Sequence, residues 1–165
     1  MQKQAPKLYL SYGANCNVDD MKVRAPASIP IGVYKLFNFK LAFNHVADIR
    51  QAPGDTCICG LWFITDDCES SLDIFEGYPT LYNKKYIKIE KSYIKPFEWI
   101  SLDEKLKDND NTALLYVMNG GGRYSRYSPP SKSYTNTIRK GYDFFNIPKT
   151  QLKNAEVESQ TSLWD

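Results

Sequence analysis

Runs of apolar residues that alternate with polar ones or are rich in aromatic and β-branched side chains indicate the strands of this chain. In one such run, Ile87 and Ile89 alternate with Lys88, as in a strand with one buried face. Five segments have this character and predict strands: 7–12, 32–44, 56–64, 84–94 and 113–118.

Helical periodicity appears in three other segments, which are 17–24, 67–76 and 131–145. A further helix is expected after Pro148, with a frayed end. Five or six strands with scattered helices predict an α+β fold, in which the sheet is too twisted or closed to be doubly wound. The chain also lacks the glycine-marked strand–helix alternation of a Rossmann fold.

Length and composition predict a globular chain. Its 165 residues suit a single domain, with a core over about 7–148 and a C-terminal tail over 149–165, and 42% hydrophobic content suffices for a core. The net charge of +2 is spread along the chain, which argues against a nucleic-acid partner. No apolar run has the roughly 18 residues of a membrane span, and the start "MQKQAPK" does not resemble a signal peptide, so we expect a cytoplasmic protein without a membrane partner.

The cysteines predict buried thiols rather than a metal site. Cys57 and Cys59 lie two apart in a predicted strand and therefore face the same side. With His45 as the single histidine, and with spacings unlike common zinc patterns, a metal is not expected. Cys16 follows a turn before a helix, where a thiol can become acidic, but no cysteine–histidine pair is evident for nucleophilic catalysis.

The stretch "SYGAN" at 11–15 ends the first predicted strand and leads into a helix. A glycine-containing turn of this kind leaves backbone N–H groups free and allows a ligand to approach closely. The turn is therefore either a corner of the fold or the floor of a binding site.

Glu76 directly precedes Gly77 at the predicted end of a helix. A carboxylate is unfavourable there because of the helix dipole, and a raised pKa would suit a general base. The alternative is a solvated helix end. Asp73 lies on nearly the same face, as a second carboxylate of a site or as a hydrogen-bond partner of the neighbouring turn.

Two later segments offer ligand-binding groups. In "SPPSKSY", Ser131 can cap a helix whose first turn carries Tyr134, which presents a phenol to an anionic ligand or belongs to an ordinary capped helix. The loop "GGGRYSRYS" at 120–128 has too few arginines for RNA binding, so a loop beside a small-molecule site is the better interpretation.

Four motifs occur in a recognisable order: "LYLSYGAN", "APGDTCICGLWFI", "LDIFEGYPTLY" and "PPSKSYTNTIRKGYDFFNIP". Together they resemble the γ-glutamylcyclotransferase family, including its AIG2-like relatives, from about Leu8 to Pro148. The resemblance implies a small mixed β-barrel flanked by helices.

The resemblance also implies roles for individual residues. Glu76 falls on the catalytic glutamate of the family. The implied substrate-binding residues are Tyr12, Gly13, Ala14, Asn15, Tyr82 and Tyr134. Ala14 replaces the usual serine, which removes one hydroxyl, and Cys16 replaces a usually apolar residue.

The family reaction converts a γ-glutamyl amide into 5-oxoproline and a free amine or amino acid. It needs no cofactor, and the implied partner is a small-molecule γ-glutamyl substrate. The sequence leaves the leaving amine unnamed and the oligomeric state open between monomer and homodimer. Two alternatives stay open: a small-ligand or peptide-binding protein on the same fold, and a cyclotransferase for a γ-glutamyl-amine or another acyl side chain.

Overall fold

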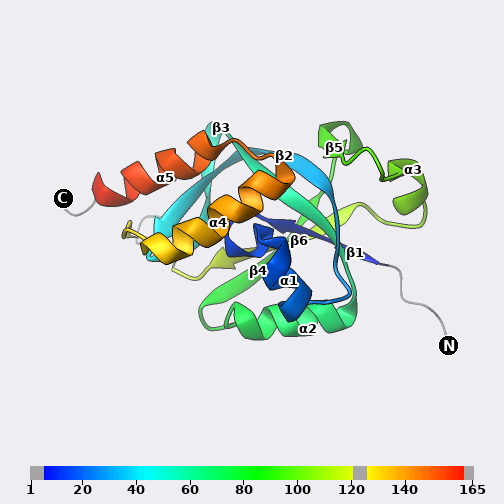
Figure 1. The fold of residues 1–165 in the computed structure, drawn as a ribbon, viewed down its shortest axis with the longest axis horizontal. Helices are drawn as coiled ribbons and strands as arrows, with labels where there is room; N and C mark the ends of the chain where they lie inside the picture. The colour runs from blue at the N-terminus through cyan, green and yellow to red at the C-terminus, as the bar shows by residue number, and fades with distance from the viewer. Residues whose placement is uncertain (1–5, 121–125, 162–165) are drawn as a thin grey trace.

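A computed structural model describes residues 6–120 and 126–161. A six-stranded sheet in the order β4-β6-β1-β3-β2-β5 forms its centre (Figure 1). The strands are β1 (Lys7–Ser11), β2 (Ile29–Asn44), β3 (Val46–Ile64), β4 (Tyr82–Lys88), β5 (Ile94–Pro96) and β6 (Thr112–Met118). The helices are η1 (Ala14–Cys16), α1 (Val18–Arg24), α2 (Asp66–Phe75), η2 (Lys91–Tyr93), α3 (Leu102–Lys105), α4 (Lys132–Phe145) and α5 (Lys149–Thr161).

The predicted α+β class is confirmed, but the predicted closed barrel is wrong. Within the described residues, β4 and β5 form opposite edges and do not pair with each other. The cause lies in the run 84–94, which was expected to be one strand. The chain leaves the sheet after Lys88, at the end of β4. It returns at Ile94 as β5, which pairs with β2 at the opposite edge.

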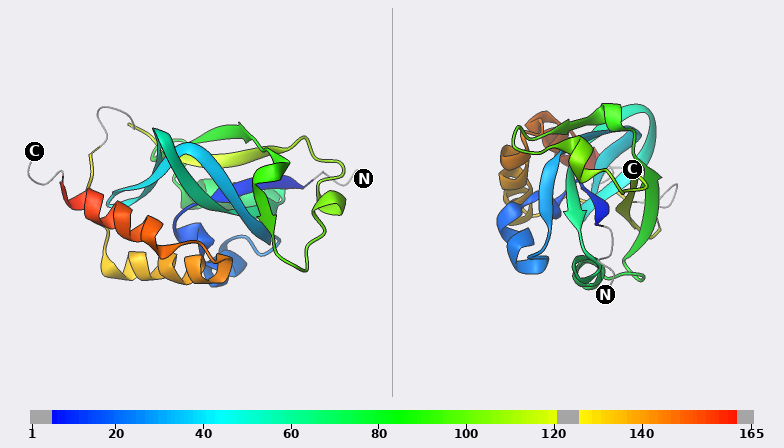
Figure 2. Two further views of the ribbon diagram at one scale, coloured as in Figure 1. Left: turned by 90° about the horizontal axis from the view of Figure 1, so that it is seen from above. Right: turned by 90° about the vertical axis from the view of Figure 1, so that its right-hand side faces the viewer.

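A long hairpin of β2 and β3 dominates the sheet, and Figure 2 shows its strong twist. The chain reverses at His45, whose φ is +66°. Strand β3 therefore begins at Val46, ten residues before the predicted start, and the Pro-Gly pair at 53–54 lies within it. Two register shifts in β2 bend the hairpin, because a bulge increases local twist.

Helices α1, α4 and α5 lie on one side of the sheet (Figure 2). Ile138, Tyr142 and Phe145 form the buried face of α4. A Cβ on Gly141 would lie 2.4 Å from the carbonyl carbon of Cys16, so glycine is required where α4 crosses η1. This close packing holds α4 directly against the turn after β1.

The four cysteines are free and buried, in keeping with the prediction from sequence. No helix in the described residues is long and apolar enough to cross a membrane.

Candidate active site

A small cavity of about 30 Å³ opens where the chain leaves β1. Its wall is formed by Tyr9, Tyr12, Gly13, Ala14, Asn15, Ala47, Phe75, Glu76, Tyr82, Tyr116 and Tyr134. The seven residues to which the family resemblance gave roles are all in this set, although they come from distant parts of the chain. The structure thus brings the turn, the end of α2, β4 and the first turn of α4 around one space.

The turn at the cavity floor leaves no space for a side chain at Gly13. A Cβ at this position would lie 2.7 Å from the Cβ of Ala47. Hydrogen bonds run from Cys16 N to Gly13 O (2.9 Å) and from Asn17 N to Ala14 O (3.0 Å). These bonds do not use the amides of Ala14 and Asn15, the first two residues of η1, and both residues line the cavity.

Glu76 is the C-cap residue that directly follows α2, and a glycine-terminated helix end positions it. Gly77 has φ +64°, its N–H donates to Ile74 O (3.1 Å), and Tyr78 N–H donates to Asp73 O (2.9 Å). This is the Schellman arrangement, in which a left-handed glycine ends the helix. The chain turns away there and leaves the Glu76 side chain in the cavity wall.

Burial raises the pKa of Glu76 to about 7, with the charge of Arg24 acting in the opposite direction. Asn15 Nδ2 donates to Glu76 Oε1 at 3.1 Å. The carboxyl group can therefore bind and release a proton near neutral pH, as general acid–base catalysis requires.

The Asn15 side chain is buried and joins three residues. Its Nδ2 also donates to the Tyr9 hydroxyl (2.9 Å), and its Oδ1 accepts a hydrogen bond from Arg24 Nη1. The Arg24 guanidinium lies 3.4 Å above the centre of the Phe75 ring. A chain of contacts therefore leads from α1 through the turn to Glu76.

Three tyrosines fix the opposite wall. The Ala47 N–H donates to the Tyr134 hydroxyl (3.0 Å), and the Tyr82 hydroxyl donates to the Ala47 carbonyl. The Tyr12 hydroxyl donates to the Tyr116 carbonyl at 2.7 Å. Burial raises the pKa of Tyr134 to about 12 and raises the pKa values of Tyr12 and Tyr82 as well, so these phenols are neutral at pH 7.

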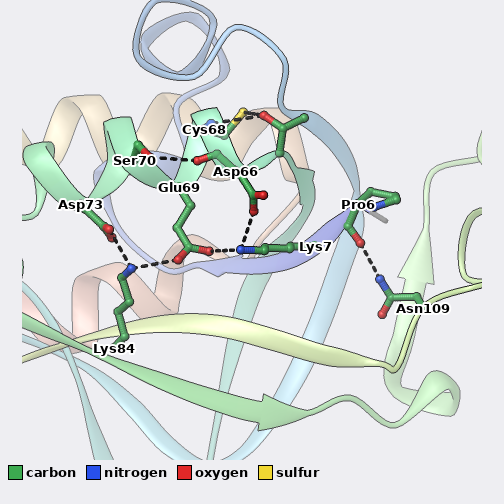
Figure 3. A network of polar contacts seen from close by, with 10 residues as sticks. Pro6, Lys7, Asp66, Cys68, Glu69, Ser70, Asp73, Lys84 and Asn109 are labelled. Carbon is green, nitrogen blue, oxygen red and sulfur yellow. Dashed lines mark hydrogen bonds and ion pairs between the residues drawn. The ribbon is translucent and has the colours of Figure 1, made fainter. Parts of the chain in front are cut away.

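Asp73 lies outside the cavity and does not supply a second carboxylate to it. Its Oδ1 accepts from the Tyr116 hydroxyl (2.6 Å), and its Oδ2 lies 2.7 Å from Lys84 Nζ. Figure 3 shows that Lys84 also reaches Glu69, at 2.8 Å, and that Lys7 bridges Glu69 and Asp66. This network ties α2 to β1 and β4, and through Asp73 it orients a tyrosine of the cavity wall.

Cys16 does not have the acidic thiol that its position before a helix suggested. The side chain is fully buried, with Sγ 3.3 Å from Ser11 Oγ, and burial raises the pKa of the thiol to about 12. In the described part of the chain, no group of three or more His, Cys, Asp or Glu side chains could hold a metal. Of the loop 120–128, residues 121–125 lie outside the described residues.

Sequence reasoning missed five of the residues around Glu76: Tyr9, Arg24, Ala47, Phe75 and Tyr116. Tyr9 carried a signal, since it lies in the strand that leads into the turn. Arg24 ends α1 and is half-buried, and a last-turn arginine is ordinary on any helix. The residue type of Ala47 gave no indication of a role, because its main-chain N–H and carbonyl groups make the contacts with Tyr134 and Tyr82.

No family model matches the chain, and no curated protein matches it in sequence. Solved structures do resemble it. A γ-glutamyl cyclotransferase superposes with a TM-score of 0.65 at 23% identity, over 95% of this chain and 88% of its own. The Homo sapiens protein loc79017 superposes with a TM-score of 0.66 at 24% identity, over 91% and 86%. YkqA from Bacillus subtilis superposes with a TM-score of 0.64 at 16% identity, over 96% of this chain and 56% of its own. The chain therefore has the fold of the γ-glutamylcyclotransferases.

Proposed function

We propose that this protein is a γ-glutamylcyclotransferase-type enzyme, which converts a γ-glutamyl amide into 5-oxoproline and a free amine. The observation that carries the proposal is the desolvated Glu76 carboxyl group, with a pKa of about 7, beside the amides of the 13–15 turn. The name of one solved structure with this fold, a γ-glutamyl cyclotransferase, agrees with the proposal.

In this reaction the α-amino nitrogen of the substrate attacks its own γ-carbonyl carbon. A five-membered ring closes, and the carbon–nitrogen bond to the leaving amine breaks. Proximity supplies much of the rate, because the nucleophile and the carbonyl belong to one molecule. Glu76 accepts a proton from the attacking nitrogen and returns it to the leaving nitrogen.

The remaining groups bind and orient the substrate. The amides of Ala14 and Asn15 donate to the oxyanion that forms on the γ-carbonyl oxygen. The neutral phenols of Tyr12, Tyr82 and Tyr134 shape the pocket for the glutamyl moiety without adding charge.

The decisive experiment is incubation with a panel of γ-glutamyl amino acids, γ-glutamyl amines and glutathione, with 5-oxoproline measured. We expect at least one of these substrates to release 5-oxoproline, and Glu76→Gln to release none above background. If no substrate turns over but several bind equally well to both proteins in calorimetry, the chain is a binding protein on this fold.

A further inference from the structure

We propose that Arg24 is the positioning residue of this site: its guanidinium fixes the Asn15 amide, which in turn holds the Glu76 carboxyl group in place. Arg24 is the last residue of α1, and Glu76 is the C-cap residue of α2, so the contact also joins the two helices. The catalytic meaning of this contact rests on the proposed function, but the contact itself can be measured without it.

An asparagine side chain has an acceptor end and a donor end, and rotation by 180° exchanges them. An arginine side chain can only donate hydrogen bonds. Arg24 therefore pairs with the Asn15 amide in the one orientation that turns Oδ1 toward the guanidinium. The Nδ2 group then faces the Tyr9 hydroxyl and the Glu76 carboxylate, which is an acceptor when ionised.

Rotation of the amide would place Nδ2 against the guanidinium, which pairs two donors, and Oδ1 against the carboxylate, which pairs two acceptors. Arg24 therefore adds to the free-energy cost of rotation and favours the orientation in which Nδ2 donates to Glu76. The Phe75 ring adds a second constraint, because the central guanidinium carbon lies above it, 3.4 Å from the ring centre. Phe75 directly precedes Glu76, so the arginine holds both the side chain and the helix end that carries it.

Charge has a second effect on the same carboxyl group. The ionisable groups that face Glu76 from β1, the turn, β4, β6 and α4 are Tyr9, Tyr12, Tyr82, Tyr116 and Tyr134. Burial raises the pKa of each of these phenols, so they are neutral at pH 7. Arg24, with Asp20 beside it on α1, therefore supplies the positive charge near Glu76.

The test is a carbon-13 NMR titration of the Glu76 carboxyl carbon in the full-length protein. Arg24→Met keeps the length of the side chain and removes its charge and its donors. We expect it to raise the midpoint of the Glu76 titration by about 1 pH unit, because an opposite charge nearby favours the ionised form. Lys22→Met is the matched control: it removes one charge from the exposed face of the same helix and should leave the midpoint unchanged.

Arg24→Lys separates charge from geometry. It should keep the midpoint near that of the wild type but broaden the nitrogen-15 signals of the Asn15 side-chain amide, since a single ammonium group does not hold the amide as the fork does. If Arg24→Met does not fold, the Asn15 side-chain signals in Arg24→Lys test the positioning role of Arg24 by themselves. Where activity is present, both variants should lower kcat more than they raise KM.

An unchanged midpoint in folded Arg24→Met, or unchanged Asn15 signals in Arg24→Lys, would overturn the proposal. Neither result depends on turnover. A protein with no cyclotransferase activity but a shifted Glu76 midpoint would instead contradict the proposed function and leave the positioning role of Arg24 intact.

Discussion

At the scale of single residues, Glu76 combines two unfavourable features for a carboxylate. It lies at the negative end of a helix dipole and it is desolvated by the tyrosine-lined wall. Proteins keep such groups where function uses them, at some cost in stability.

Glu76→Gln should abolish turnover, with a loss of at least the roughly 10²–10⁴-fold contribution of general acid–base catalysis, since an amide cannot accept the proton. Its thermal unfolding midpoint at pH 8 should equal or exceed that of the wild type, because the variant no longer buries a charge. Steady-state kinetics and calorimetry measure the two effects. A Gln variant within a few-fold of wild-type activity would rule out the assigned role.

The pH dependence follows from the raised pKa of Glu76. The basic form is needed for catalysis, so kcat/KM should fall below about pH 7 as Glu76 becomes protonated. Stability should move in the opposite direction. The folded protein holds the Glu76 proton more tightly than the unfolded chain, so this residue's contribution declines as pH rises from 4.5 to about 7. Urea unfolding of wild type and Glu76→Gln across this range measures the difference; parallel curves would contradict it.

At the scale of the elements, the turn after β1 and the start of β3 are fitted to each other. Gly13→Ala should destabilise the fold by about 1–3 kcal/mol, because the new Cβ would lie 2.7 Å from the Cβ of Ala47. The double variant Gly13→Ala with Ala47→Gly should recover part of this loss, since it removes the facing methyl group. Denaturant unfolding of the single and double variants tests the contact, and equal losses would show that the facing methyl group is not the cause.

The network in Figure 3 predicts how firmly α2 is held. Lys84 has little solvent exposure and bridges Glu69 and Asp73, so Lys84→Met should cost about 1–3 kcal/mol, between the effects of surface and buried ion pairs. Lys149→Met is the matched control, because its ion pair with Asp143 is exposed and should contribute less than about 1 kcal/mol. Similar losses in the two variants would show that the network does not anchor α2.

The sequence predicted most elements and seven of the residues that line the cavity, but not how the elements close around it. Local pattern located β1, β6, α1, α2 and α4, since each has its own periodicity or cap. It did not locate the first half of β3, where Pro-Gly within a strand resembles a turn. It also did not show that the run 84–94 is divided between β4 and β5, the two edge strands of the sheet, because strand pairing depends on long-range packing.

The same limit applies to the cavity. Gly13 and Glu76 could be identified from the sequence, because a glycine in a strand-to-helix turn and a carboxylate at the C-terminal end of a helix each stand out. Ala47 and Arg24 were not, since their part in the site comes from the hairpin reversal at His45 and from the packing of α1 on α2. Tertiary contacts of this kind have no local signature.

At the scale of the whole molecule, the cavity lies where elements from the beginning, middle and end of the chain meet. Strand β1 supplies the floor, the β2–β3 hairpin supplies Ala47, and α4 supplies Tyr134. The sheet order places β1 next to the parallel strand β6, whose Tyr116 carbonyl accepts from Tyr12. The site is therefore complete only when the whole sheet and α4 have assembled.

The Ala47 amide gives this assembly a direct reporter. Its hydrogen is held by the hydroxyl of Tyr134, 87 positions along the chain, so its exchange with solvent deuterium follows the undocking of α4. The Ile49 amide, two residues further along β3, donates instead to the side chain of its neighbour Asp48. In Tyr134→Phe, we expect exchange at Ala47 to accelerate by about tenfold, the equivalent of one lost hydrogen bond, while exchange at Ile49 stays as in the wild type. Equal acceleration at both amides would mean that α4 and the hairpin open together, as one cooperative unit.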